Sequence, residues 1–394
     1  MKKVFIALTA LSAIANVAQA QSSVSIYGIV DTGVSYTSKA LIPGTTTGAT
    51  GSKMSVDSGL NSGSRLGFKG TEDLGGGLSA LFQLEMGFKM DTGALDGSNN
   101  GAANTSTLFR RLSVVGLSSS YGTILLGRQT DLAYQSGQFT SVADFGGITG
   151  AVGHNLDRFE GLRTNNSIRF NSATYSGFSA SAIYGFGEVA GQNDAGQAVG
   201  LGAQYANGPL TVFTGFYQSR LGAAATDISS DTSTLVAGNG KAGDIAVKVV
   251  NLGASYLLKD TRIYANWSQI KQPLATIAAV PGTGILPSGY IIGGANNDKT
   301  NVYEIGANYS FTAPLHIIAS AQHSVLNFAG SGHPQGKLTQ LNLGVDYFLS
   351  KRTDLYAIAS NLRASSTYNP GVDGTAAGQN NNQTVLSVAV RTRF

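Results

Sequence analysis

Hydrophobic and polar residues alternate one by one along much of this chain, and the last twelve residues show the pattern clearly. Within 383–394, Val388, Val390 and Phe394 share one parity, whereas Arg391 and Arg393 share the other. Successive side chains of a β-strand point to opposite faces, so a strand here has one apolar face and one basic, hydrated face. This combination is typical of a strand in a transmembrane β-barrel.

The same alternation, interrupted by Gly, Asn, Asp and Ser, recurs along the chain and predicts sixteen antiparallel strands. Their expected spans are 23–37, 63–71, 78–89, 107–118, 121–129, 163–175, 178–188, 198–206, 209–219, 245–258, 261–270, 300–311, 314–326, 338–349, 353–364 and 383–394. Tight turns such as Ser176-Gly177 alternate with long polar connections such as 38–62 and 130–162. We therefore predict an all-β fold, a 16-stranded antiparallel transmembrane β-barrel with short periplasmic turns and long extracellular loops.

The first twenty residues read as a separate segment. Lys2 and Lys3 precede an apolar stretch over 4–14, and Ala18-Gln19-Ala20 supplies the small residues of a cleavage site. The apolar stretch is shorter than the roughly 20 residues that span a bilayer. We expect residues 1–20 to be a signal peptide and residues 21–394 to form one β-barrel domain outside the cytoplasm.

Composition argues against several kinds of partner and site. The formal net charge is +4, but the basic residues are dispersed, so the sequence does not indicate a nucleic-acid partner. The absence of cysteine excludes a disulfide framework, and 52 glycines with 8 prolines suit tight turns between strands. The four histidines are too scattered for a metal site, and no motif requires a cofactor.

Several short strings, in this order and spacing, resemble the Gram-negative general diffusion porins, most of all their β-proteobacterial branch. The strings are Ser23 to Gly28 (SVSIYG), Ser64 to Gly70 (SRLGFKG), Gly122 to Arg128 (GTILLGR), Asp144 to Gly147 (DFGG) and the terminal Arg393-Phe394. The resemblance implies a homotrimer of sixteen-stranded barrels in the outer membrane, surrounded by lipid and lipopolysaccharide. It also implies that the third loop folds into the lumen and constricts the pore.

Strand parity predicts which basic side chains face this pore. In 63–71 it sends Arg65 and Lys69 inward. In 107–118 we expect Leu112 and Val114 to face lipid, which places Arg111 inward. In 163–175 the same reasoning places two further arginines inward, Arg163 and Arg169. The resemblance assigns three of these residues to the basic cluster of the constriction: Arg65, Arg111 and Arg163.

The acidic side of the constriction is expected on the long connection 130–162, facing the arginines. By resemblance, Asp144 occupies an acidic position there, whereas Thr140 replaces a second loop acid of enteric porins. Glu85 and Asp31 face inward by parity and are weaker candidates from the wall. With more arginines than acids, the sequence predicts a weak anion preference in the field across the pore.

These features predict a passive, water-filled channel for small hydrophilic solutes and ions, and no enzyme. An outer-membrane hydrolase would need a nucleophile with a His or acid partner, which no constellation in this sequence suggests. A substrate-selective channel of the same fold stays as the alternative. Phe394 resembles the terminal aromatic by which the outer-membrane assembly machinery recognises the family, and 90–106 is expected either to latch onto a neighbour or to be an ordinary loop.

Overall fold

The computed structural model describes residues 23–42, 49–96, 108–132, 163–188, 190–191, 197–220, 246–271, 297–328, 336–365, 371–372 and 380–394. The described residues form seventeen β-strands, and every pair of neighbouring strands is antiparallel. They are β1 (Ser23–Leu41), β2 (Thr50–Ser58), β3 (Arg65–Gly75), β4 (Leu78–Gly87), β5 (Leu112–Ser119), β6 (Gly122–Thr130), β7 (Arg163–Ser172), β8 (Phe178–Gly185), β9 (Ala198–Asn207), β10 (Leu210–Arg220), β11 (Ala246–Leu258), β12 (Thr261–Lys271), β13 (Asn297–Ser310), β14 (Leu315–Phe328), β15 (Gly336–Phe348), β16 (Thr353–Ser365) and β17 (Asn382–Arg393).

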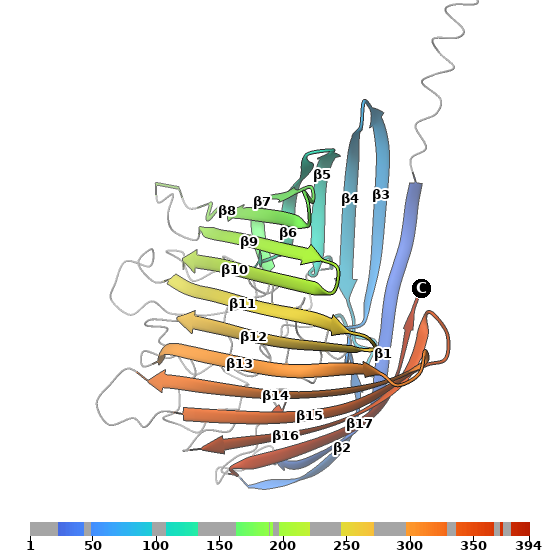
Figure 1. The fold of residues 1–394 in the computed structure, drawn as a ribbon, viewed down its shortest axis with the longest axis vertical. Helices are drawn as coiled ribbons and strands as arrows, with labels where there is room; N and C mark the ends of the chain where they lie inside the picture. Colours follow the sequence, from blue (N-terminus) through green and yellow to red (C-terminus); the bar gives the residue numbers. More distant parts are fainter. Residues whose placement is uncertain are drawn as a thin grey trace, which may run out of the picture.

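The first strand closes the sheet on itself (Figure 1). β1 pairs with β17 on one side and with β3 and then β2 on the other. Because β2 and β3 lie end to end along β1, they share one position, and the seventeen strands make a closed ring of sixteen. A closed ring leaves no unpaired strand edge, which is the condition for a β-sheet to cross lipid. The predicted 16-stranded antiparallel barrel is confirmed.

The strand β2 is the main departure from the sequence prediction. It lies inside the expected loop 38–62, and β1 continues to Leu41 to pair with it. Apolar side chains in this stretch are few, and only Met54 and Val56 present an apolar face. Its alternation is therefore too short to stand out from the polar residues around it.

Tight turns join the strands along one rim of the barrel, where the end of the chain also lies (Figure 1). The turn from β3 to β4 consists of Gly75, Gly76 and Gly77, with φ angles of 83°, 63° and 79°. These left-handed conformations favour glycine because it has no Cβ. Two expected turns are also present: Ser176-Gly177 lies between β7 and β8, and Asn207-Gly208 lies between β9 and β10.

The outer face of the barrel is apolar. In β17, Val388 is 65% exposed, whereas Arg391 is 2% exposed, as the alternation in the sequence predicts. The same outward pattern appears on other strands, for example at Val24, Ile305 and Leu343. Exposed aliphatic side chains in a continuous band are suited to lipid and unsuited to water. Among the described residues, no helix is long and apolar enough to cross a membrane.

The expected orientation of β5 is wrong. Val115 is 58% exposed and Val114 only 5% exposed, so Val114 and Leu112 face the lumen. Both parities of this strand carry apolar residues, so the alternation alone does not choose between them. The pairing with β4 decides the orientation, because Leu112 lies opposite Glu85 and Val114 lies opposite Gln83, both on the lumen side.

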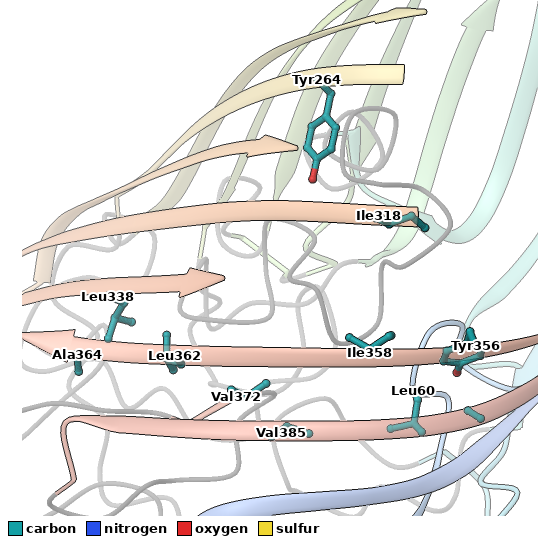
Figure 2. Packing of buried hydrophobic residues seen from close by; sticks show 11 residues of the cluster. Leu60, Tyr264, Ile318, Leu338, Tyr356, Ile358, Leu362, Ala364, Val372 and Val385 are labelled. Carbon is teal, nitrogen blue, oxygen red and sulfur yellow. The ribbon is translucent and has the colours of Figure 1, made fainter. Parts of the chain in front are cut away.

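Part of the lumen side is packed rather than open. Figure 2 shows an apolar cluster along β16 and β17 that includes Tyr356, Ile358, Leu362 and Val385. Leu60 joins this cluster from the segment between β2 and β3, and Val372 joins it from the connection between β16 and β17. Residues of two inward-folded segments therefore cover part of the inner face of β16 and β17.

Candidate functional site

A cluster of polar and charged side chains on β1, β3 and β4 is organised around Glu85. The Tyr27 hydroxyl donates to Glu85 Oε2 at 3.0 Å, and Gln83 Nε2 donates to the Tyr27 hydroxyl oxygen at 2.6 Å. Lys69 Nζ lies 5.5 Å from the centre of the Tyr27 ring, within the range of a cation–π contact. Arg65 extends from the same strand as Lys69, with its NH1 atom 3.9 Å from Glu85 Oε1.

Arg111 enters this cluster from the residue before β5. Its Nε atom donates to Glu85 Oε1 at 2.6 Å, and its backbone N–H donates to the Glu85 carbonyl at 3.1 Å. Because Arg111 precedes the strand, its side chain reaches the lumen although β5 has the opposite parity from the one expected. Gly63 and Gly87 leave the space for it, since a Cβ at either would lie 3.1 Å from Arg111 side-chain atoms.

Arg163, at the start of β7, is held against Arg111. Its Nε atom donates to the Arg111 carbonyl at 2.7 Å. The structure thus brings Arg65 and Arg111 onto the Glu85 carboxylate, with Arg163 bonded to the Arg111 backbone and Lys69 over the Tyr27 ring. Four basic side chains thus gather on this stretch of the lumen wall, which is named here the basic cluster.

Arg169 lies deeper in the wall of β7 and is buried. Its Nε atom donates to Asn171 Oδ1 at 2.7 Å, and its NH1 atom donates to the Thr130 carbonyl at 3.2 Å. It lines a recess of about 420 Å³ on the lumen side, together with Gln83 and Leu125. Arg169 therefore faces inward as predicted, but its donors are directed at neighbouring groups of the wall.

The three predicted acids have different positions. Glu85 lies within the basic cluster, where it holds Arg111 and Arg65. Asp144 lies outside the described residues. Asp31 is 0% exposed and does not present its carboxylate to the lumen water, contrary to the expectation that it lines the constriction. Burial behind the segment 59–64, which parity could not reveal, accounts for the difference.

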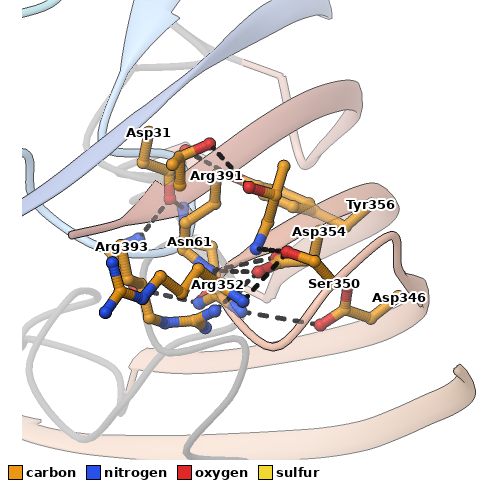
Figure 3. A network of polar contacts seen from close by, with 12 residues as sticks. Asp31, Asn61, Asp346, Ser350, Arg352, Asp354, Tyr356, Arg391 and Arg393 are labelled. Atoms are coloured by element: carbon orange, nitrogen blue, oxygen red, sulfur yellow. Dashed lines mark hydrogen bonds and ion pairs between the residues drawn. The ribbon is translucent and has the colours of Figure 1, made fainter. Parts of the chain in front are cut away.

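A second charged network, which sequence reasoning missed, surrounds Asp31 (Figure 3). Arg391 is expected on the hydrated face of its strand but is buried, with its Nε atom 3.0 Å from Asp354 Oδ2 and its NH2 atom 3.5 Å from Asp346 Oδ2. Arg393 NH1 lies 2.7 Å from Asp354 Oδ1. Parity placed both arginines on the inner face, but it could not show that Asp354 on β16 and Asp346 on β15 pair with them.

Phe394 closes the outer face at the turn-side rim. Its backbone N–H donates to the Gly28 carbonyl at 3.1 Å, and its carbonyl accepts from Gly28 N–H at 3.0 Å. The Phe394 ring lies directly over Gly28, so any side chain at that position would overlap it. The terminal aromatic is thus fixed to β1 and faces outward, as its parity predicts.

The described residues contain no group of three or more His, Asp or Glu side chains placed to hold a metal ion. This site acts on solutes through its charge, because permanently charged guanidinium groups lie on the wall of the water-filled lumen.

Comparison with known proteins agrees with this architecture. The family model of Gram-negative porins matches residues 7–389. An outer membrane porin protein of Bordetella pertussis is 31% identical, over 91% of this chain and 94% of its own. Outer membrane porin protein 32 of Delftia acidovorans is also 31% identical, over the whole of both chains.

Solved structures show the same relationship. The anion-selective porin from Comamonas acidovorans superposes with a TM-score of 0.70 at 28% identity, over 95% of this chain and all of its own. OmpT of Vibrio cholerae, at 15% identity, shares the fold with a TM-score of 0.65. A closed barrel with an apolar exterior and a charged lumen crosses the outer membrane as a passive, water-filled channel. The chain belongs to the Gram-negative porin family.

Proposed function

We propose that the basic cluster makes this porin a channel with a weak preference for anions. The observation that carries the proposal is the gathering of four basic side chains, Arg65, Lys69, Arg111 and Arg163, on one stretch of the lumen wall. Anions that pass this wall meet a positive potential, whereas cations are repelled from it. The low-dielectric walls of the pore focus this electric field into the water path, where it acts strongly on charged solutes.

Arginine is suited to this role because its guanidinium group stays charged next to other cations. Glu85 does not reverse the sign of the field, since its carboxylate is shared between Arg111 and Arg65. Asp144, from the connection between β6 and β7, is the expected acid on the other side of the water path. The field would then run across the pore from the basic cluster to this loop.

A relative supports the direction of the preference. The solved porin from Comamonas acidovorans, 28% identical to this chain, is described as anion-selective. The proposal carries that property over to this chain because basic side chains gather on the wall described above. It concerns ions and small hydrophilic solutes in general, and implies neither catalysis nor a cofactor.

The experiment is a zero-current potential across a planar bilayer that contains the purified porin, with a tenfold KCl gradient. The expected result is a potential whose sign shows that chloride crosses more readily than potassium, by a small factor. A potential of the opposite sign would refute the anion preference and leave the channel function in place. Saturation of the conductance by one solute at low concentration would instead favour a substrate-selective channel.

Three further proposals concern export and assembly. Residues 1–20 would act as a signal peptide that is removed on export. Three barrels would associate in the membrane, as in trimeric porins. Phe394 would be recognised by the outer-membrane assembly machinery, and its outward position at the rim supports this role because the ring is accessible there.

A further inference from the structure

The segment 59–64, called here the insert, leaves the wall between β2 and β3 and folds against the lumen side of β1. β1 pairs with β3 up to Ile29 and with β2 from Thr32, so the backbone around Asp31 has no strand partner on that side. The insert supplies the missing bonds. Gly59 N–H donates to the Asp31 carbonyl at 2.8 Å, and Ser64 Oγ accepts from Asp31 N–H at 3.1 Å.

The Asp31 carboxylate binds the backbone of the insert. Its Oδ2 atom accepts from the backbone N–H groups of Asn61 at 3.1 Å and Ser62 at 2.6 Å, and its Oδ1 atom accepts from the Tyr356 hydroxyl. Charge-assisted bonds from two successive amides fix the backbone of the insert in one conformation. A buried carboxylate with three donors is a structural anchor rather than an ion-binding group.

Arg391 holds the insert from the last strand. It lies directly opposite Asp31 in the β1–β17 pair, and its NH1 atom donates to Ser62 Oγ at 3.0 Å. Asp354 fixes the guanidinium group from the other side (Figure 3). Leu60 adds an apolar contact, since it is buried in the cluster with Tyr356. Closure of the barrel and the position of the insert therefore depend on one buried network.

The insert in turn forms part of the basic cluster. The Gly63 carbonyl accepts from Arg65 Nε at 2.9 Å, and Arg111 NH1 lies so close that a Cβ at Gly63 would be 3.1 Å from it. The Ser64 carbonyl accepts from Phe88 N–H at 3.1 Å, which ties the insert to the end of β4. A shift of the insert would therefore release Arg65 and change the space that Arg111 occupies.

We propose that Asp31 and Arg391 are positioning residues for ion selectivity, acting through the insert on Arg65 and Arg111. The inference rests on the anion preference proposed above. It predicts an effect opposite in sign to that of a simple lumen acid. Removal of a negative charge that acts through the field alone would raise the anion preference. Removal of the anchor instead lowers it, because Arg65 loses its bond to the Gly63 carbonyl and the space beside Arg111 changes.

The experiment compares Asp31→Asn with the wild type by zero-current potential in the planar bilayer. The chloride-to-potassium permeability ratio is expected to fall toward one, because charges that are no longer held in place focus the field less strongly. Glu304→Gln is the matched control. Glu304 is also buried and accepts a tyrosine O–H bond, from Tyr264 at 2.6 Å, but lies on β13, and Figure 2 shows Tyr264 apart from Leu60. We expect no fall for this control.

A second variant, Leu60→Ala, decides the matter if Asp31→Asn does not assemble. It loosens the insert without changing any charge, and the permeability ratio is again expected to fall. In the background Arg65→Gln, the effect of Asp31→Asn should shrink, because the two residues act through one contact chain. A wild type without anion preference refutes the proposed function. An anion-preferring wild type whose ratio is unchanged or raised in Asp31→Asn and Leu60→Ala refutes the positioning role alone.

Discussion

At the scale of single residues, the basic cluster depends on one close approach between a ring and a backbone. The Tyr27 ring lies over Gly67, and a Cβ there would overlap the ring atoms. The Tyr27 hydroxyl in turn donates a hydrogen bond to Glu85, and the Tyr27 ring makes a cation–π contact with Lys69. A glycine in β3 therefore determines where three polar side chains of the lumen wall can lie.

The change Gly67→Ala tests this dependence. The added methyl group forces Tyr27 out of its position, so the free energy of unfolding should fall by about 1–3 kcal/mol, the usual cost of an overpacked site. Urea unfolding of the reconstituted barrel measures the change. Gly51→Ala is the matched control, because a Cβ there has its nearest contact at 3.7 Å and the backbone is unstrained. Equal stability of the two variants would contradict the described packing.

At the scale of one element, β5 shows where alternation does not determine the orientation of a strand. Its sequence LSVVGL offers apolar residues to both faces, and only the pairing with β4 selects Val115 for the lipid side. On β17, by contrast, Arg391 and Val388 are chemically unlike, and the orientation follows from the sequence alone. Side-chain chemistry thus predicts a face only where the two faces differ.

Single cysteines can test the orientation of β5, since the chain has none of its own. Val115→Cys should react only with a maleimide that partitions into the membrane, because its side chain points to lipid. Leu125→Cys, on the adjacent strand β6, lines the lumen recess and should react with a water-soluble maleimide. If the water-soluble reagent labelled Val115→Cys from inside the pore, residue 115 would face the lumen, which is the orientation of β5 expected from the sequence.

At the scale of the whole molecule, strand number, closure and the outward apolar face are predictable from alternation and turn chemistry. The inward directions of Arg65 and Arg163 also follow from parity, whereas Arg111 reaches the lumen although the expected parity of β5 is wrong. The insert and the burial of Asp31 and Arg391 are not predictable, since they depend on side-chain contacts between segments that alternation does not specify, such as Tyr356 with Asp31 and Ser62 with Arg391. The parity of a residue predicts which face of the strand its side chain is on, but it does not predict whether another segment covers that side chain.

The assembled state gives another prediction at this scale. Deletion of Phe394 removes the outward ring that lies over Gly28 and its two backbone bonds to β1. We expect less assembled trimer in the outer membrane, seen by electrophoresis of unheated samples, with unchanged conductance for each pore that does form. Substitution Phe394→Tyr retains an aromatic ring and serves as the control. A wild type that runs only at monomer mass would contradict the trimer, and normal amounts of the deletion variant would contradict the assembly role.

The central claim is that arginines of the lumen wall set the ion preference of this porin. The most direct test is the zero-current potential in a KCl gradient for the double variant Arg65→Gln/Arg111→Gln. The account predicts that the chloride preference of the wild type is lost, while Arg363→Gln, which removes an arginine from the outward-facing parity of β16, leaves it unchanged. An unchanged chloride preference in the double variant would contradict the account.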